Sequence, residues 1–525
     1  MEPGAPGHVV VCGFGHLGQS VVQLLSRLGE RVVVISDQTR RATGVRLDDP
    51  NVRFIRGDAR DASVLEKADL TGARAVIAAT DHDLTNVEIA LDVRRANADT
   101  PVVVRLFDQN LARMLEQSFD VRRAFAMSAL AAPIFASAAL DDPLLARFDF
   151  GDDAFVIAET SDLAKSNGST LAAHGLTLAP ETAWKTLLGE PEATPIKSAT
   201  NLAAALRWPA AVWRHAPLSM RITFMLLVGL TMISVFVFSA GMQLGLVDAF
   251  YFMITTITTT GYGDITPKDS ATVIKLYTCF VMLLGSATTA LFYSFFTDFI
   301  VAERFRRVAQ NPDVTLEGHV VVIGLGNVGY RIVENLRRFG VPVVGVDVDA
   351  AAPFASELRS QLPVLAGDGR LSGTLDRAGV ARARALIAAT GNDATNLEIA
   401  LAAKHKARNV RVVSRLFDPA FATKVQGVLP IERALSASRV ASPSFVAAAL
   451  FTDVVAAFVR NSTFVVVTRE AAPATWAGRT AADLQRAEGV ALVLQSGDGA
   501  HTPVDAEARV VAGARYVLVR QRPLG

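Results

Sequence analysis

The sequence predicts a membrane α-helical pore (two spans plus a pore loop) combined with two α/β domains whose parallel sheets are doubly wound. Two observations predict this fold class. The first is a pair of long uncharged segments, 222–247 and 276–297, near the middle of the 525-residue chain. The second is a set of four short sequence blocks that occurs once before and once after these segments, in the same order.

Length and composition limit the classes of protein that fit. A chain of 525 residues is too long for one core, so three or four domains are expected. The net charge is +1, which gives no bulk electrostatic argument for a nucleic-acid partner. Two cysteines, Cys12 and Cys279, cannot build a disulfide framework. Residues 1–7 lack a basic region followed by an apolar run, so we expect the first domain to stay in the cytoplasm.

The uncharged segments have the length of membrane spans. A helix needs about 20 apolar residues to cross the bilayer core, and both segments meet this requirement. Arginines precede the first span and follow the second, whereas the connecting segment holds few basic residues: Arg207, Arg214, Arg221, Arg304, Arg306, Arg307 against Lys268 and Lys275. This distribution predicts a multi-pass protein of the cell (inner) membrane with both termini in the cytoplasm. Trp208 and Trp213 suit the membrane interface, and the segment 201–215 is either an interfacial helix or an ordinary linker.

The repeated blocks define the soluble domains. The paired blocks are 8–18 with 319–329, 75–80 with 385–390, 86–91 with 396–401, and 105–108 with 415–418. Each copy alternates strand and helix patterns, which predicts a parallel sheet with helices on both faces. The expected division is a first doubly wound domain (1–140), a small subdomain and interfacial linker (141–218), a two-span pore (219–302), a second doubly wound domain (318–450) and a C-terminal subdomain (451–525). The fold of the first small region could not be assigned.

The segment between the spans carries a potassium selectivity motif: Thr259, Thr260, Gly261, Tyr262, Gly263, Asp264. Potassium must exchange its water for backbone carbonyls, here those of residues 259–262, and four chains each supply one strip, which predicts a homotetramer. Glycine is expected at 261 and 263 because alternate residues need unusual backbone angles. Tyr262 is expected to hold the strip at width, and Asp264 to favour cations at the outer mouth. Residues 248–258 have the length of a short pore helix whose C-terminal end favours a cation.

Residues 223–301 resemble the pore of two-span potassium channels. Thr260 departs from the commonest filter pattern, which has valine at that position. The resemblance places Gly285 at the gating hinge of the inner helix, and close helix packing explains the same glycine equally well.

Each doubly wound domain opens with a glycine fingerprint after its first strand: Gly13, Gly15, Gly18 and Gly324, Gly326, Gly329. These glycines allow a tight turn and the approach of a pyrophosphate to a helix N-terminus, as in Rossmann-like domains. The fingerprint is better evidence for the fold than for a bound ligand.

Residues 7–140 and 318–450 resemble RCK domains and the NAD-binding (TrkA-N) subunit of the Trk potassium uptake system. The resemblance implies paired domains, a gating ring, and NAD(H) or another adenine nucleotide as ligand. The further ligand positions it implies are Asp37, Asp58, Thr80, Arg105, Asp347, Asp368, Thr390 and Arg415. Some such domains bind a divalent cation; the candidates here are Asp58, Asp81, Asp83 and Glu88, which are otherwise solvated surface acids.

The two copies differ at the end of the second strand, where Ser36 stands opposite Asp347. An acid there accepts hydrogen bonds from ribose hydroxyls, so the second copy is expected to favour NAD-like ligands. In the first copy, Ser36 with Arg40 and Arg41 either tolerates a 2′-phosphate or marks a domain that has lost its ligand.

Three functions were compared. The leading one is a ligand-gated potassium channel, and the alternative is an NAD-binding regulatory subunit of a potassium uptake system, which would need no filter. The third, an NAD-dependent oxidoreductase, lacks a convincing catalytic constellation among eight scattered histidines, so no enzyme is expected.

Overall fold

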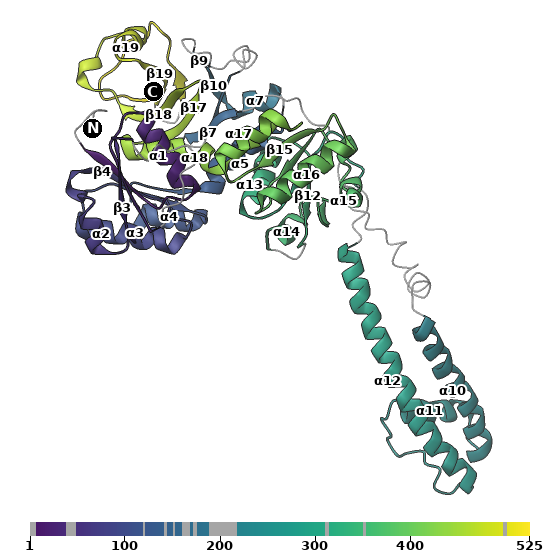
Figure 1. Ribbon diagram of the computed structural model, residues 1–525. Coiled ribbons are helices and arrows are strands. Elements are labelled where there is room, and N and C mark those ends of the chain that lie inside the picture. The colour runs from purple at the N-terminus through teal and green to yellow at the C-terminus, as the bar shows by residue number, and fades with distance from the viewer. Residues whose placement is uncertain are drawn as a thin grey trace. The chain divides into compact units, whose positions relative to one another are not determined.

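The computed structural model describes residues 7–37, 49–118, 121–140, 144–150, 153–159, 169–171, 176–187, 218–309, 314–349, 353–496 and 501–525. The chain forms two compact units (Figure 1). One unit combines Met1–Ala193 with Pro312–Gly525, and the other is Thr194–Asn311. Each is considered by itself.

The first doubly wound domain is built on six parallel strands in the order β3-β2-β1-β4-β5-β6. The strands are β1 (His8–Cys12), β2 (Val32–Ser36), β3 (Val52–Arg56), β4 (Ala73–Ala78), β5 (Val102–Leu106) and β6 (Arg123–Ala126). The helices are α1 (His16–Arg27), α2 (Ala62–Glu66), α3 (Asp83–Ala96), α4 (Gln109–Ser118) and α5 (Met127–Ala138). Helices α1 and α5 pack on one face of the sheet and α2, α3 and α4 on the other, so the central strands are buried on both sides.

The second domain repeats this topology, with the strand order β13-β12-β11-β14-β15-β16. Its strands are β11 (Val320–Ile323), β12 (Val343–Asp347), β13 (Val364–Ala366), β14 (Ala385–Ala388), β15 (Arg411–Arg415) and β16 (Arg433–Leu435). Its helices are α13 (Asn327–Arg338), α14 (Pro353–Leu358), α15 (Ser372–Arg377), α16 (Asp393–Lys406), α17 (Pro419–Val428) and α18 (Ala437–Leu450). In both sheets the strand order reverses beside the first strand, which is where the glycine loops lie. The expected doubly wound fold is confirmed.

The two domains pair within one chain. Helix α5 of the first packs on α13 of the second, and α18 of the second packs on α1 of the first (Figure 1). Residues from both domains share one buried core, in which the ring of Phe125 meets that of Phe445 edge-on at 5.1 Å between centroids. This large apolar interface holds the two domains together.

Each domain is followed by a small antiparallel sheet. The first has the order β7-β8-β10-β9, with β7 (Leu144–Phe150), β8 (Asp153–Ala158), β9 (Ser169–Leu171), β10 (Leu176–Pro180) and the helix α7 (Glu181–Leu187). The second has the order β17-β18-β21-β19-β20, with β17 (Val454–Arg460), β18 (Thr463–Ala471), β19 (Val490–Ser496), β20 (His501–Pro503), β21 (Arg515–Pro523) and the helix α19 (Ala481–Glu488). The two sheets share a buried core that includes Phe155 and Phe458. The fold of the first sheet, which sequence patterns left unassigned, is therefore stabilised by long-range packing against the second.

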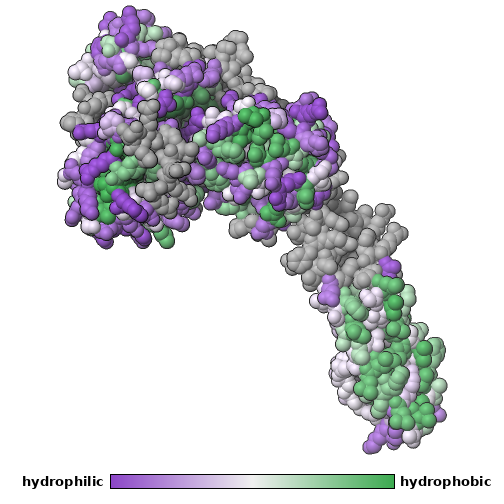
Figure 2. All heavy atoms as spheres, in the orientation of Figure 1, coloured by the Kyte–Doolittle hydropathy of each residue, from purple (hydrophilic) through white to green (hydrophobic). Residues whose placement is uncertain are grey.

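The other unit contains three helices in its described part: α10 (Leu218–Met242), α11 (Leu246–Ile257) and α12 (Thr272–Ala309). Two segments, Leu218–Met242 and Thr272–Asp298, are long and apolar enough to cross a membrane. Hydrophobic residues cover the visible face of these helices in Figure 2, and Leu283 is 75% exposed. The uncharged run 222–247 proves to span two helices, because the chain turns at Gln243 (φ 51°) and starts α11 three residues later. The segment 201–215, with its tryptophans and arginines, lies outside the described residues.

Candidate functional site

The pore helix α11 is held by packing between α10 and α12. Its buried side chains Ala249, Phe252 and Met253 share a core with Phe238 of α10 and Val281 of α12. The rings of Phe238 and Phe252 meet edge-on with their centroids 5.0 Å apart. This packing fixes the C-terminal end of α11, from which the filter strip begins.

The segment 259–264, named the filter strip here after its predicted role, has alternating backbone handedness. Thr259, Gly261 and Gly263 have φ values of 57°, 52° and 78°, so every second residue lies in the left-handed region. In an extended strip successive carbonyls point to opposite sides, and a change of handedness at alternate residues brings them to one side. A Cβ added to Gly261 or Gly263 would meet no atom within 4 Å, so glycine is favoured there by conformation and not by space. Thr259 adopts the same region with a side chain, which sequence reasoning did not foresee; the cost is of order 1–2 kcal/mol.

Hydrogen bonds from the strip to the pore helix support this conformation. The amides of Thr260 and Gly261 both donate to the Thr255 carbonyl, at 3.0 and 3.1 Å. The hydroxyls of Thr258 and Thr260 lie 2.9 Å apart and share a hydrogen bond. A valine at 260 could not make this bond, so the departure from the commonest filter pattern has a structural use.

The outer end of the strip also lies near α11, where the Tyr251 hydroxyl is close enough to the Asp264 carboxylate to interact with it. The remainder of the strip is exposed in the single chain, and Tyr262 is 71% exposed. All residues from 258 to 264 are thus exposed in one chain, although the strip is hydrogen-bonded to α11.

Gly285, the expected hinge, lies inside the unbroken helix α12. A Cβ at Gly285 would approach Ile257 Cγ1 to 3.0 Å. The glycine is needed for the close contact between α12 and the end of the pore helix, whatever its role in gating.

The glycine loops after β1 and β11 are closely packed. Gly13 (φ 102°) and Gly324 (φ 91°) have no room for a Cβ, which would lie 2.8 and 2.7 Å from the amide nitrogens of Thr80 and Thr390. At Gly18 and Gly329, the third glycines, a Cβ would collide with the carbonyl oxygen of the first. These glycines are required by the loop itself. Only the middle glycine of each loop faces the space that a pyrophosphate would use.

A buried asparagine organises the edge of each site, and sequence reasoning missed its role. Asn396 is fully buried; its Oδ1 accepts hydrogen bonds from the Thr390 amide (2.8 Å) and hydroxyl (2.7 Å). Its Nδ2 donates to the carbonyls of Thr390 (3.1 Å) and Arg415 (3.0 Å). Asn86 makes the same four bonds in the first domain. One sequence signal could have indicated this role: Asn86 and Asn396 are the first residues of the matching blocks 86–91 and 396–401.

The carboxylates after the third strands are paired with arginine. Arg60 lies 2.7 Å from Asp58 and 3.3 Å from Glu88, and Arg370 repeats these pairs with Asp368 and Glu398. Arg60 and Arg370 hold the pKa values of Asp58 and Asp368 below their usual range by hydrogen bonding. Asp83 instead accepts the Phe107 amide at 2.9 Å. Among the described residues, no group of three potential metal ligands is present.

The residues at the end of the second strand, where ribose binding is predicted, differ between the domains. Asp347 ends β12, and its Oδ2 accepts the amide of Leu325 in the glycine loop at 2.6 Å. Ser36 occupies this place at the end of β2, and Asp37 follows it in an exposed position. Arg40 and Arg41 lie outside the described residues.

The arginines near the ends of the fifth strands, Arg105 of β5 and Arg415 of β15, differ in their partners. Arg105 Nη1 donates to Asp81 Oδ1 at 2.5 Å and to the Thr80 carbonyl at 2.8 Å. Arg415 stacks over the Phe417 ring at 4.3 Å, and burial lowers its pKa to about 10. No described carboxylate lies within 4 Å of the Arg415 guanidinium, because Gly391 stands where the first domain has Asp81.

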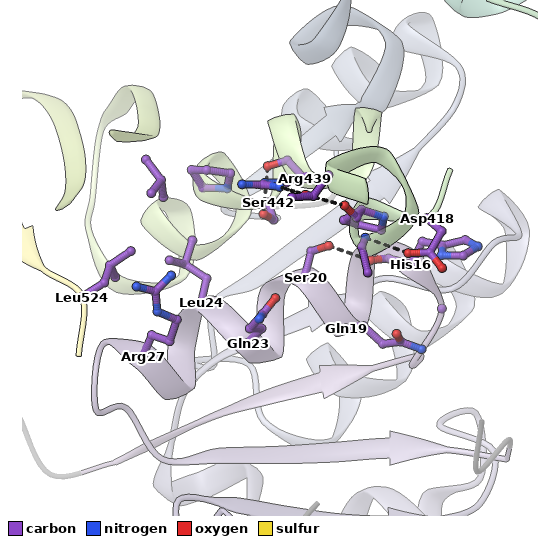
Figure 3. A pocket seen from close by; sticks show the side chains of 16 residues that line it. His16, Gln19, Ser20, Gln23, Leu24, Arg27, Asp418, Arg439, Ser442 and Leu524 are labelled. Carbon is purple, nitrogen blue, oxygen red and sulfur yellow. Dashed lines mark hydrogen bonds between the residues drawn. The ribbon is translucent and has the colours of Figure 1, made fainter. Parts of the chain in front are cut away.

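A cavity of about 440 Å³ lies where the two domains meet. Helix α1 forms one wall, with His16, Gln19, Gln23 and Arg27, and Asp418, Arg439 and Ser442 of the second domain lie opposite (Figure 3). Two polar side chains that line this cavity already make hydrogen bonds within the protein. Asp418 caps α17, and Arg439 donates a hydrogen bond to the Thr423 hydroxyl at 2.9 Å.

Comparison with protein families agrees with both parts of the chain, the two glycine-loop domains and the two-span unit. The model of the TrkA-N domain matches residues 9–126 and 320–437, and that of the ion channel domain matches 222–302. The chain contains two TrkA-N domains and one ion-channel domain. The expected resemblance to potassium channels with RCK domains is thereby confirmed, and the chain is a membrane protein.

Several known proteins are similar to part of this chain. The voltage-gated potassium channel Kch of Escherichia coli is 28% identical over 190 residues, which cover 35% of this chain and 45% of Kch. Probable potassium channel protein 2 of Methanocaldococcus jannaschii is 28% identical over 176 residues, covering 32% and 50%. The chain thus spans about half the length of these relatives. Among solved structures, the GsuK RCK domain has a TM-score of 0.51 at 16% identity, covering 99% of this chain and 93% of its own. The GsuK channel bound to NAD has a TM-score of 0.50 at 15% identity, covering 99% and 78%. Identities this low support the fold alone.

Proposed function

We propose that this chain is one subunit of a potassium-selective channel of the cell (inner) membrane, gated by a nucleotide that binds its TrkA-N domains. The observation that carries the proposal is the filter strip, in which Thr259, Gly261 and Gly263 alternate in handedness with their neighbours. Carbonyls aligned on one side replace the water shell of a dehydrated potassium ion. The potassium channels named among the relatives support this reading.

The proposed assembly is a homotetramer in a lipid bilayer. One strip supplies a quarter of the ion's ligands, and its exposure in a single chain leaves faces for three further subunits. Both termini are assigned to the cytoplasm, with the acidic end of the strip at Asp264 facing outward. The domain boundaries proposed from the sequence (1–140, 141–218, 219–302, 318–450 and 451–525) accompany this arrangement.

The proposed gating ligand is NAD(H) or another adenine nucleotide. In the second TrkA-N domain the residues fit such a ligand: nothing within 4 Å would meet a Cβ at Gly326, and the N-terminus of α13 offers amides to phosphate. Asp347 stands where ribose hydroxyls are bound, and Arg415 supplies positive charge. A nucleotide would contribute its negative pyrophosphate and its ribose hydroxyls. Divalent cations fit less well, since Arg60 already neutralises Asp58 and Glu88. The proposal assigns no catalytic role.

The alternative, a nucleotide-binding regulatory subunit of a potassium uptake system, draws on a TrkA homolog of Pyrococcus abyssi that is 26% identical over 118 residues. A regulatory subunit would account for the TrkA-N domains, but it would have no function for residues 259–264. The channel explains both.

The channel is tested by cation flux into proteoliposomes that contain the purified full chain. Potassium flux should exceed sodium flux strongly, and Gly263→Ala should abolish it, because a side chain opposes φ near 78°. Gly229→Ala in α10 is the matched control, since nothing within 4 Å would meet its Cβ. A flux that does not distinguish potassium from sodium would refute the channel. Native mass measurement in mild detergent should give four chains; a dimer with full flux would refute the assembly.

A further inference from the structure

We propose that the two TrkA-N domains are unequal: the carboxylate of Asp81 closes the phosphate site of the first, so that nucleotide binds only in the second. This inference rests on the proposed nucleotide gating and adds which of the two domains senses the ligand, and which residue decides it.

In the first domain the place of a phosphate is taken by the chain's own anion. A Cβ built on Gly15, the middle glycine of the loop, would lie 3.2 Å from Asp81 Oδ2. The other oxygen of Asp81 accepts a hydrogen bond from Arg105 Nη1 at 2.5 Å. The carboxylate therefore lies against the glycine loop and is paired with the arginine that would otherwise meet a phosphate.

In the second domain the same place is open. Gly391 replaces Asp81, and neither Gly326 nor Gly391 has any atom within 4 Å of an added Cβ. Arg415 is partly buried and stacks over the Phe417 ring at 4.3 Å, and the carboxylate that acts on it, Asp393, does so without an ion pair within 4 Å. A partly buried guanidinium and the N-terminal amides of α13 both favour an anion.

The charge balance decides which domain binds. In the first domain an incoming phosphate would have to displace Asp81 from Arg105, and it would meet a negative charge beside the loop. An intramolecular carboxylate also competes at a high effective concentration. In the second domain a phosphate meets an arginine that has only the more distant Asp393 as a carboxylate neighbour, so binding adds a close charge pair and breaks none.

The test exchanges Asp81 and Gly391. Each variant introduces at its position the residue that the other domain has there. The full chain in detergent is titrated with ADP and separately with NADH, and the number of sites per chain is measured. The wild type should bind one ADP per chain. Gly391→Asp should weaken this site about 100-fold or more, and Asp81→Gly should add a second site. The double exchange should again bind one. Asp81→Gly leaves the buried Arg105 with its hydrogen bond to the Thr80 carbonyl but without its carboxylate partner, so some loss of melting temperature accompanies the gain of the site.

Two results would overturn the inference while nucleotide gating stands: two sites in the wild type, or wild-type affinity in Gly391→Asp. Absence of ADP and NADH binding in all four proteins would overturn both the inference and nucleotide gating. Potassium flux measured on the same samples tests the pore separately. A thermal melt of each variant checks folding, and the gain of a site in Asp81→Gly cannot arise from misfolding.

Discussion

The α-carbon of Gly285 in the inner helix faces Ile257, the last residue of the pore helix, so closely that a methyl group on Gly285 would lie 3.0 Å from Ile257 Cγ1. Gly285→Ala should therefore displace the pore helix, and we expect a loss of about 1–3 kcal/mol in stability together with reduced potassium flux. Thermal unfolding and flux in proteoliposomes measure the two effects.

The companion variant separates close packing from a hinge. Ile257→Ala removes Cγ1, the atom at the point of contact, so Gly285→Ala should cost less stability and less flux in this background than in the wild type. If Gly285→Ala lowers open probability equally in both backgrounds, flexibility at Gly285 is the cause and the hinge interpretation is the better one.

Asn396 should be the most sensitive polar residue at the edge of the second TrkA-N site. Asn396→Leu preserves its approximate volume and leaves the amide and hydroxyl of Thr390 without their partner. We expect a loss of about 3 kcal/mol or more in stability. Asn392→Ala, which removes the N-cap bond to Thr395, is the control and should cost about 1 kcal/mol. Equal melting temperatures for the two variants would contradict this role.

His319 should make stability depend on pH. It is fully buried, its Nε2 hydrogen-bonds the Ala378 carbonyl at 2.9 Å, and burial lowers its pKa below the ordinary value of 6.5. The unfolded chain therefore takes up a proton more readily than the folded one, and this contribution to stability is present above pH 6.5 and lost as the pH falls below it.

The melting temperature should thus fall between pH 7.5 and pH 5, and His319→Gln should flatten this dependence. His8 occupies the same position in the first domain and is only partly buried, with its Nε2 2.7 Å from the Ala68 carbonyl. His8→Gln should leave the pH dependence as in the wild type. An unchanged slope in His319→Gln would assign the effect to other groups.

The connection between the pore and the second TrkA-N domain should transmit gating. Helix α12 runs to Ala309, and Val314 is already buried, with its amide bonded to the Arg377 carbonyl at 2.9 Å. The segment between them is therefore shorter than the gap between the pore (219–302) and the second domain (318–450) expected from the sequence. A Gly/Ser insert of about ten residues at 310–313 should weaken the effect of nucleotide on potassium flux, because a flexible linker dissipates displacement. The same insert within 497–500 is the control. An unaltered nucleotide response after insertion at 310–313 would argue against mechanical coupling.

The membrane spans, the glycine conformations and the two repeated domains could be predicted from the sequence, because each depends on residues that are close together in the chain. The length of an uncharged run fixes whether a helix can span a bilayer, and Gly13, Gly261 and Gly263 supply positive φ values that other residues adopt only at a cost. The repeated blocks also predicted two domains of equal topology, since the same pattern of strands and helices must bury the same faces. Such features require no knowledge of distant contacts.

Contacts between residues far apart in the chain were decided by the tertiary structure. Asp81 was a candidate for a cation and Arg105 for a phosphate; the fold brings them within 2.5 Å of each other, so that each satisfies the charge of the other. The bonds of Asn396 and the packing of the first small sheet on the second arise in the same way. The sequence by itself determined a filter strip, two spans and two glycine-loop domains. Only the tertiary structure decided that one of these domains holds its own anion while the other, with Gly391, leaves Arg415 open, because a charge balance depends on which side chains meet in space.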